Sequence, residues 1–216
     1  MNKELENLAK SLVTAGFSAK EVWYMASQRL TEKELNRLWS IPRQNIYEFV
    51  TSCFANFDLK PPFLDLGCGK RSYKPEITEK LGEGITYIAL DHYLSDDKTT
   101  PEKLPNLLAD VCHLPFSSSS INTVICTELL EHIEDDNLAM AEISRVTKKG
   151  GILILTLPGR HIPKHEKPPY QIDYRRYSHA DIDNLLIKHS FEILHFERKT
   201  LLDLGINLFI TAQKTK

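Results

Sequence analysis

Pro62–Tyr73 reads PFLDLGCGKRSY, a short apolar run that breaks into a turn with two glycines. Its first half suits a strand that is buried on both faces of a sheet. Gly67 and Gly69 can adopt positive φ and allow a bound molecule to approach the bare backbone. In open α/β sheets, ligands lie outside the carboxyl ends of such strands. The stretch therefore predicts an interior parallel strand with a ligand-binding turn, although two glycines alone also serve a turn that binds nothing.

The chain before this stretch is predicted to be helical. Leucines recur at helical spacing near the start, and S/T-x-x-E capping boxes at Ser18 and Thr31 begin further helices. Pro42 is expected to open another helix. We therefore expect residues 1–60 to form a helical cap, or a lid that carries tryptophan and tyrosine side chains over a substrate, and residues 61–216 to form one α/β domain.

Strand and helix patterns alternate after the glycine turn. Apolar runs predict strands over residues 63–66, 86–90, 107–111, 121–126, 152–157, 191–196 and 208–212. Helical periodicity predicts helices over residues 75–81 and 129–146, and Ser178 with Asp181 is predicted to cap a further helix. Alternation at this pace indicates an α/β fold with a doubly wound, mostly parallel sheet and an N-terminal helical extension.

The composition narrows the class of protein. The 216 residues are 42% hydrophobic and 26% charged, and no apolar run approaches the roughly 18 residues of a membrane span. The first residues lack the apolar region of a secretory signal, so we expect a cytoplasmic protein. We expect it to be a monomer or a homodimer. A net charge of -2 argues against a nucleic-acid binder. The four cysteines form no C-x-x-C pair and are expected to be reduced and mostly buried.

Acidic residues follow three neighbouring strands of the predicted sheet. Asp65 lies at the glycine turn, Asp91 ends the second strand and Asp110 ends the third. An acid after the second strand is placed to accept hydrogen bonds from both ribose hydroxyls of an adenosine. Asp110 can accept from an exocyclic amine, and the N–H of Val111 can donate to an adenine ring nitrogen. The three acids together predict a cofactor that contains adenosine.

Four motifs in order resemble the class I S-adenosylmethionine-dependent methyltransferases of the methyltransferase type 11 kind. They are FLDLGCG at 63–69, the acid Asp91, ADVCHLPF at 109–116 and ELLEHI at 128–133, and the resemblance covers residues 62–214. It implies a Rossmann-like methyltransferase fold with seven strands, S-adenosyl-L-methionine as cofactor and S-adenosyl-L-homocysteine as product. The cofactor-binding residues that it implies are Asp65, Gly67, Cys68, Gly69, Arg71, Asp91, His92, Asp110, Val111, Glu128 and His132.

One position departs from that family pattern. Arg71 stands where a glycine is usual, two places after Gly69. A guanidinium or ammonium here can pair with a carboxylate, so we hypothesise that Arg71 or Lys70 binds the methionyl carboxylate of the cofactor. The alternative is a pair of solvated basic side chains.

The segment after the fifth predicted strand is rich in groups that could act on an acceptor. If the acceptor is a hydroxyl or an amine, a general base removes its proton, and we predict His165, Glu166 or Glu128 for this role. Arg175 or Arg176 would then hold an anionic group of the acceptor. A polar loop without catalytic function is the alternative. His161 and His165 have zinc-ligand spacing, but Pro163 disfavours a helix that carries both, so no metal site is expected.

The expected function is methyl transfer to a small-molecule acceptor, by in-line displacement at the sulfonium methyl, with oxygen or nitrogen as the nucleophile. A cofactor-binding subunit that only supports a catalytic partner is an alternative. So is a protein or RNA acceptor, although the asparagine-proline-proline-aromatic motif of amino-group methylation is missing where the chain has Cys126–Leu129. An oxidoreductase with an adenine dinucleotide is disfavoured because the G-x-G-x-x-G fingerprint lacks its third glycine.

Overall fold

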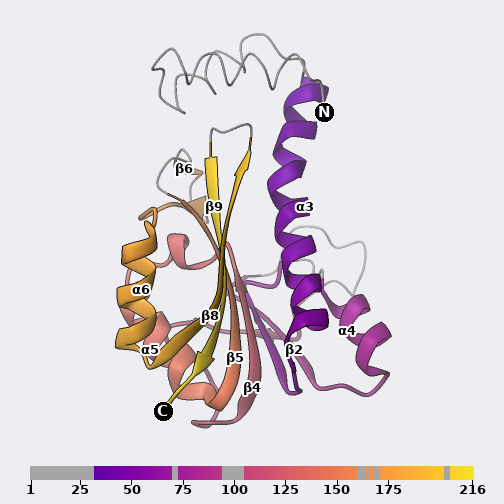
Figure 1. The fold of residues 1–216 in the computed structure, drawn as a ribbon, viewed down its shortest axis with the longest axis vertical. Helices are drawn as coiled ribbons and strands as arrows, with labels where there is room; N and C mark the ends of the chain where they lie inside the picture. The colour runs from indigo at the N-terminus through magenta and orange to yellow at the C-terminus, as the bar shows by residue number, and fades with distance from the viewer. Residues whose placement is uncertain are drawn as a thin grey trace.

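A seven-stranded sheet forms the centre of the protein. The computed structural model describes residues 32–69, 73–93, 105–159, 164, 166–167, 171–201 and 205–216. Within them the sheet has the order β3-β2-β1-β4-β5-β9-β8 (Figure 1). Strands β1 to β5 pair in parallel, and β9 is antiparallel to both β5 and β8. The predicted doubly wound, mostly parallel sheet of seven strands is confirmed. The strands are β1 (Phe63–Leu66), β2 (Tyr87–Asp91), β3 (Leu107–Leu108), β4 (Ile121–Thr127), β5 (Thr147–Pro158), β8 (Phe191–Leu201) and β9 (Gly205–Lys214).

Helices cover both faces of this sheet, as Figure 1 shows. Helices α3 (Glu32–Asn56) and α4 (Lys74–Leu81) pack on one face, where Phe49, Val50 and Ile77 join the side chains of Phe63 and Phe209. Helices α5 (Asp136–Val146) and α6 (His179–Lys188) cover the other face. Because both faces are covered, most residues of the inner strands β1, β4 and β5 are apolar and buried. Among the described residues, no helix combines the length and the apolarity that crossing a membrane requires.

The N-terminal extension is represented by α3. This helix runs without a break through Pro42, so the prediction that Pro42 opens a new helix was wrong. A proline removes one backbone hydrogen bond from a helix. The apolar face that continues beyond it, with Ile46, Phe49 and Val50, is buried against the sheet. The other residues of the predicted cap, 1–31, lie outside the described residues, and a lid there stays a prediction.

Two predicted boundaries were wrong on either side of α5. The helix predicted from residue 129 begins only at Asp136, because the side chain of Asp135 caps it by accepting from the N–H of Leu138 at 2.9 Å. A short 3₁₀ turn, η2 (Leu130–His132), precedes it. Strand β5 begins at Thr147 and not at residue 152, with Gly150 at φ 78° where the pairing register with β4 shifts.

Short elements surround the sheet's carboxyl edge. Strand β3 has only two residues, so Asp110 and Val111 lie beyond its end and not within it. The segment after β5 carries a two-stranded hairpin of β6 (Glu166–Lys167) and β7 (Gln171–Ile172). Helix α6 begins as predicted, with a capping box between Ser178 and Asp181.

Candidate functional site

The chain reverses its winding direction at the carboxyl edge between β1 and β4. From β1 the sheet extends through β2 and β3 on one side and through β4 and β5 on the other. Leu66 pairs with both Leu90 and Cys126, so the three strands end side by side. Open α/β sheets bind ligands at such a switch point, outside the carboxyl ends of the strands. The residues that follow β1, β2 and β4 are therefore the candidate site.

The glycine turn after β1 is tied to β2. The N–H of Cys68 donates to the Leu90 carbonyl at 3.1 Å, and the N–H of Gly69 donates to Asp91 Oδ2 at 3.0 Å. Gly67 and Gly69 have φ of 64° and 47°, which favours glycine. A Cβ on Gly67 would come within 3.1 Å of Leu129, whereas a Cβ on Gly69 would meet open space. A ligand can therefore approach the backbone at Gly69.

The acids after β2 and β3 are accessible and hydrogen-bonded to backbone. Asp91 Oδ1 accepts from the N–H of His92 at 2.7 Å, which leaves both carboxylate oxygens with capacity for further donors. Asp110 Oδ1 accepts from the N–H of Cys112 at 2.8 Å, and its Oδ2 lies 3.2 Å from His113 Nδ1. Partial burial opposes ionisation, but these two contacts outweigh it and lower the pKa of Asp110. Beside these acids, Val111 is buried.

Asp65 lies inside the sheet. Its side chain is buried, and Tyr87 on β2 donates its hydroxyl to Asp65 Oδ2. Tyr73, at the start of α4, is also buried, and its hydroxyl lies 3.5 Å from Thr127 Oγ1. Burial, with the charges of Asp65 and Glu128, raises the pKa of Tyr73 above its usual range. Tyr73 is thus electrostatically coupled to acids at the ends of both β1 and β4.

Glu128 follows β4 directly, in an unusual backbone conformation. Its φ is 47°, which is uncommon for a residue with a side chain. Its N–H donates to the Thr156 carbonyl at 3.0 Å, and its Oε1 accepts from the Thr156 hydroxyl at 3.0 Å. Burial raises the pKa of Glu128 to about 7, although the hydrogen bond from Thr156 and the charge of Arg176 oppose this. Strained backbone that holds an acid with a raised pKa is typical of functional sites.

Further charged groups surround Glu128 and form what we call the ion cluster: Glu128, Glu131, His132, Asp173 and Arg176. Arg176 Nη2 donates to Asp173 Oδ2, and His132 Nδ1 lies 2.9 Å from Asp173 Oδ1. His132 Nδ1 also lies 3.2 Å from the Ile172 carbonyl oxygen, so this nitrogen carries a proton. The His132 Nε2 lies 3.8 Å from Glu131 Oε1. The ion cluster therefore joins the turn after β4 to the loop after β7.

Several predicted catalytic and cofactor residues cannot be placed. His165 and Arg71, with Lys70, lie outside the described residues, and so does His161. Glu166 is in β6, but its side chain is not described. Of the three predicted catalytic residues, only Glu128 can be followed to its contacts.

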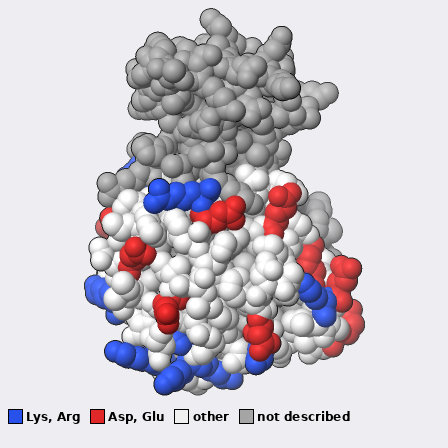
Figure 2. Space-filling view, viewed as in Figure 1, with Lys and Arg blue, Asp and Glu red and all other residues white. Residues whose placement is uncertain are grey.

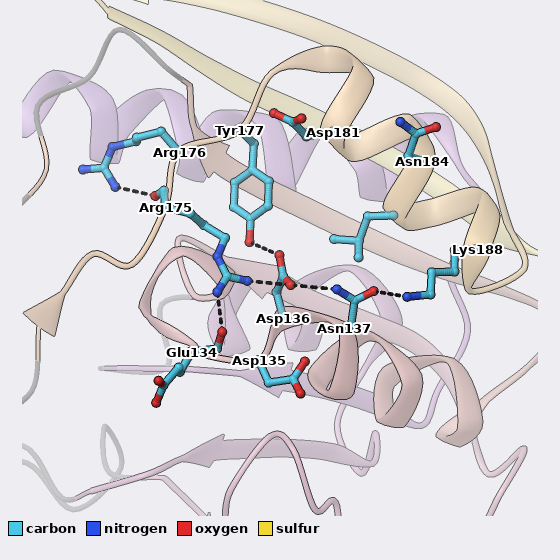
Figure 3. A pocket seen from close by; sticks show the side chains of 11 residues that line it. Glu134, Asp135, Asp136, Asn137, Arg175, Arg176, Tyr177, Asp181, Asn184 and Lys188 are labelled. Carbon is cyan, nitrogen blue, oxygen red and sulfur yellow. Dashed lines mark hydrogen bonds and ion pairs between the residues drawn. The ribbon is translucent and has the colours of Figure 1, made fainter.

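The two arginines predicted to hold an anionic acceptor have partners within the chain. Figure 3 shows Arg175 directed toward Asp136 and Glu134, while Arg176 extends away from them. Arg175 pairs with Asp136 Oδ1 and donates to the Glu134 carbonyl. Arg176 pairs with Asp173. The interactions that the structure shows for both guanidinium groups therefore stabilise the loop, and they give no support to anion binding.

Four residues of the site were missed by sequence reasoning. They are Tyr73, Tyr87, Thr156 and Glu131. Tyr87 and Thr156 lie in apolar strands and were counted as sheet residues. A signal existed for Glu131, since it is an acid within the apolar pattern that was predicted to be one helix. The contacts of the other three join residues at least 22 positions apart and had no local signal.

Comparison with known proteins agrees with this geometry. Residues 64–155 match the family model described as a methyltransferase domain. An uncharacterized protein of Methanocaldococcus jannaschii is 31% identical over 52% of this chain and 48% of its own length. A probable S-adenosylmethionine-dependent methyltransferase of Mycolicibacterium smegmatis is 24% identical over 72% of this chain and 60% of its own.

A solved structure shows the same fold. The 1,6-didemethyltoxoflavin-N1-methyltransferase of Burkholderia thailandensis, solved with 1,6-didemethyltoxoflavin and S-adenosylhomocysteine, superposes with a TM-score of 0.61. It is 16% identical, over 85% of this chain and 84% of that one. The sheet order and the switch point are those of the Rossmann-like methyltransferase fold. The family-model match over residues 64–155 makes the chain similar to the class I S-adenosylmethionine-dependent methyltransferases.

The chain matches only part of the length of its relatives. The chain spans only 40% to 48% of the first three curated relatives that it matches. What those proteins act on therefore belongs to them, and the activity of this chain is argued from its own residues.

Proposed function

We propose that the chain catalyses S-adenosylmethionine-dependent methyl transfer to a small-molecule acceptor, with oxygen or nitrogen as the nucleophile. The bound cofactor would supply a methyl group activated by its sulfonium, and the protein would align the acceptor for in-line displacement. One observation carries the proposal. The Asp91 carboxylate is held against the glycine turn by the Gly69 N–H, at the switch point that Glu128 borders from the other side.

The described residues fit such a cofactor. Asp91 keeps accepting capacity on both oxygens for the two ribose hydroxyls, and the space beside Gly69 is open for the methionine part. Asp110 can accept from the adenine amine and the Val111 N–H can donate to the ring, with the partly buried side chain of Phe116 as an apolar wall. We extend the proposal to Asp65, Gly67, Cys68, His92, Glu128 and His132 as neighbours of the same site, and Arg71 remains predicted from sequence.

Glu128 is our proposed general base. An acid with a pKa near 7 can take a proton from a hydroxyl or an amine at neutral pH, because it is ionised in a useful fraction of molecules. His165 and Glu166 remain alternative bases on the segment after β5. The base matters only for acceptors that lose a proton on methylation.

The surface favours a small acceptor over a nucleic acid. On the face seen in Figure 2, acidic and basic side chains of the described residues are interspersed, and neither sign covers the face. Nucleic-acid binding relies on a continuous basic surface.

We also propose a cytoplasmic location, supported by four cysteines that are all unpaired.

The test has two stages. Calorimetric titration of the purified chain with S-adenosylhomocysteine should show saturable binding, strongly weakened in Asp91→Ala and unchanged in the surface control Asp58→Asn. Tritiated S-adenosylmethionine should then label the small-molecule fraction of an extract of the source organism, and Glu128→Gln should slow this labelling.

Other outcomes identify the alternatives. Labelling confined to the RNA or protein fraction would contradict a small-molecule acceptor. Cofactor binding without transfer to any fraction would favour a non-catalytic subunit that supports a partner. Absence of binding would overturn the whole proposal.

A further inference from the structure

The ion cluster contains more acids than bases. Three carboxyl groups, those of Glu128, Glu131 and Asp173, face one guanidinium and one imidazole. Arg176 is bonded to Asp173, and His132 lies closest to Asp173 as well. Among the described residues, no lysine or arginine donates a hydrogen bond to Glu128 or Glu131. Glu131 is buried and Glu128 is partly buried, and the closest basic contact of the pair among the described residues is His132 Nε2, 3.8 Å from Glu131 Oε1.

Glu131 is the most isolated of these acids. Its side chain is 3% exposed, and its Oε2 has no hydrogen-bond partner among the described residues. An ionised oxygen that is buried in this way is costly, whereas a protonated carboxyl is tolerated. Burial and the nearby charge of Glu128 raise the pKa of Glu131 well above its usual range. Like-charged neighbours in one site favour a state in which one of them is protonated.

The other titratable groups facing the glutamates do not change this balance. They come from β1, the start of α4, β4, η2 and the loop after β7, and they are Asp65, Tyr73, Cys126, His132, Asp173 and Arg176. Tyr73 and Cys126 stay neutral because burial and the neighbouring acids raise the pKa of both. Asp65 adds a further acid. Among the described residues, the acids of this region therefore outnumber its two basic groups, Arg176 and His132, when no ligand is bound.

We propose that Glu128 and Glu131 together hold one proton in the ligand-free protein, and that binding of the cationic sulfonium cofactor releases this proton whereas binding of the neutral thioether product does not. In this release, one carboxyl O–H bond of the glutamate pair breaks and the proton passes to the buffer. The inference rests on the proposed function, since it requires that the cofactor binds beside Glu128.

The position of Glu128 provides the physical reason. It follows β4 immediately, and β4 lies beside β1, whose glycine turn borders the same switch point. A sulfonium bound there would favour the ionised form of the nearby acids. After transfer of the methyl group, the sulfur is neutral, and the glutamate pair can take up the proton that the acceptor loses. The same pair would thereby distinguish cofactor from product by charge.

Proton counting by calorimetry tests this inference without knowledge of the acceptor. The full chain is titrated with S-adenosylmethionine and with S-adenosylhomocysteine at pH 7, in phosphate and in Tris, which differ in ionisation enthalpy. We expect up to about one more proton released with S-adenosylmethionine, and affinity for it that rises up to about tenfold per pH unit near neutrality. The α-amino group of each ligand titrates close to this range, so the variants supply the reference.

Glu128→Gln and Glu131→Gln should each abolish the extra proton, and the control Glu134→Gln, an exposed acid on the same loop, should retain it. A ¹³C carboxyl titration of the wild-type chain gives a second readout that needs no variant. It should show a glutamate that titrates well above its usual range and shifts downward with S-adenosylmethionine only. Equal proton counts for both ligands, or no glutamate with such a titration, would overturn the inference. Failure of both ligands to bind would instead reject the proposed function.

Discussion

The two sides of the switch point handle negative charge in opposite ways. On the β2 and β3 side, Asp91 and Asp110 are accessible and accept hydrogen bonds from backbone N–H groups. On the β4 and β5 side, Glu131 is buried and Glu128 is partly buried, and the pKa values of both are raised. Ionised, solvated acids suit recognition of hydroxyls and ring nitrogens, whereas buried acids respond to charge. We infer that one side recognises the nucleoside and the other handles the proton.

The largest effect is expected from removing the guanidinium of the ion cluster. Arg176→Gln leaves the buried carboxyl groups of Glu131 and Asp173, and the partly buried one of Glu128, without this guanidinium, which should cost about 3 to 5 kcal/mol of unfolding free energy. Arg175→Gln is the matched control, because its pair with Asp136 is more exposed. Chemical denaturation of both variants measures the difference. Equal losses would show that the buried side of the switch point is not electrostatically distinct.

The next largest effect is expected on cofactor affinity, from substitutions of the accessible acids Asp91 and Asp110. Asp91→Ala should weaken binding of S-adenosylhomocysteine by about 10- to 100-fold, since hydrogen bonds to a charged group contribute about 1.5 to 3 kcal/mol. Asp110→Asn should weaken it less, because the amide oxygen can still accept. Calorimetry measures both. Unchanged affinity in Asp91→Ala would remove that residue from the nucleoside site.

The raised pKa of Glu128 should also make the stability of the folded protein depend on pH. A carboxyl group with a raised pKa stabilises the folded state while it is protonated, so this contribution is complete below about pH 4.5 and is lost as the pH rises through about 7. Glu128→Gln removes this loss. Its melting temperature relative to wild type should therefore be higher at pH 8 than at pH 5, by a few degrees. A difference that does not vary with pH would contradict the raised pKa.

The smallest effects are expected from substitutions of Gly67 and Gly69, which should differ in their losses of stability and of cofactor affinity. Gly67→Ala and Gly69→Ala both place a side chain at positive φ, at a cost of about 1 to 2 kcal/mol. Gly67→Ala should lose more stability because its Cβ meets Leu129, and Gly69→Ala should lose more cofactor affinity because its Cβ occupies the open space. Thermal melts and calorimetry on the same two variants test this. Equal binding would place the ligand away from Gly69.

Local patterns predicted much of the fold. The apolar run of β1, the glycines at positive φ and the capping box of Ser178 and Asp181 depend on residues close in sequence, and each was predicted. The start of α5 was misplaced because the apolar repeat continues through η2, and only the cap formed by Asp135 marks the true beginning.

The buried side of the site could not be predicted in the same way. The ion cluster joins Glu131 and His132 to Asp173 and Arg176, about forty positions later in the chain, and only the folded sheet brings them together. The pair of Arg175 with Asp136 joins distant positions in the same way, whereas the partner of Arg176, Asp173, lies only three residues before it. Anion binding by these arginines stays a prediction.

A crystal structure of the chain with S-adenosylhomocysteine tests the central claim most directly. We predict that the ribose hydroxyls lie within hydrogen-bond distance of the Asp91 carboxylate and that the homocysteine part passes Gly69 toward Glu128. A ligand bound elsewhere, or a ribose without contact to Asp91, would contradict the assignment of the switch point as the cofactor site.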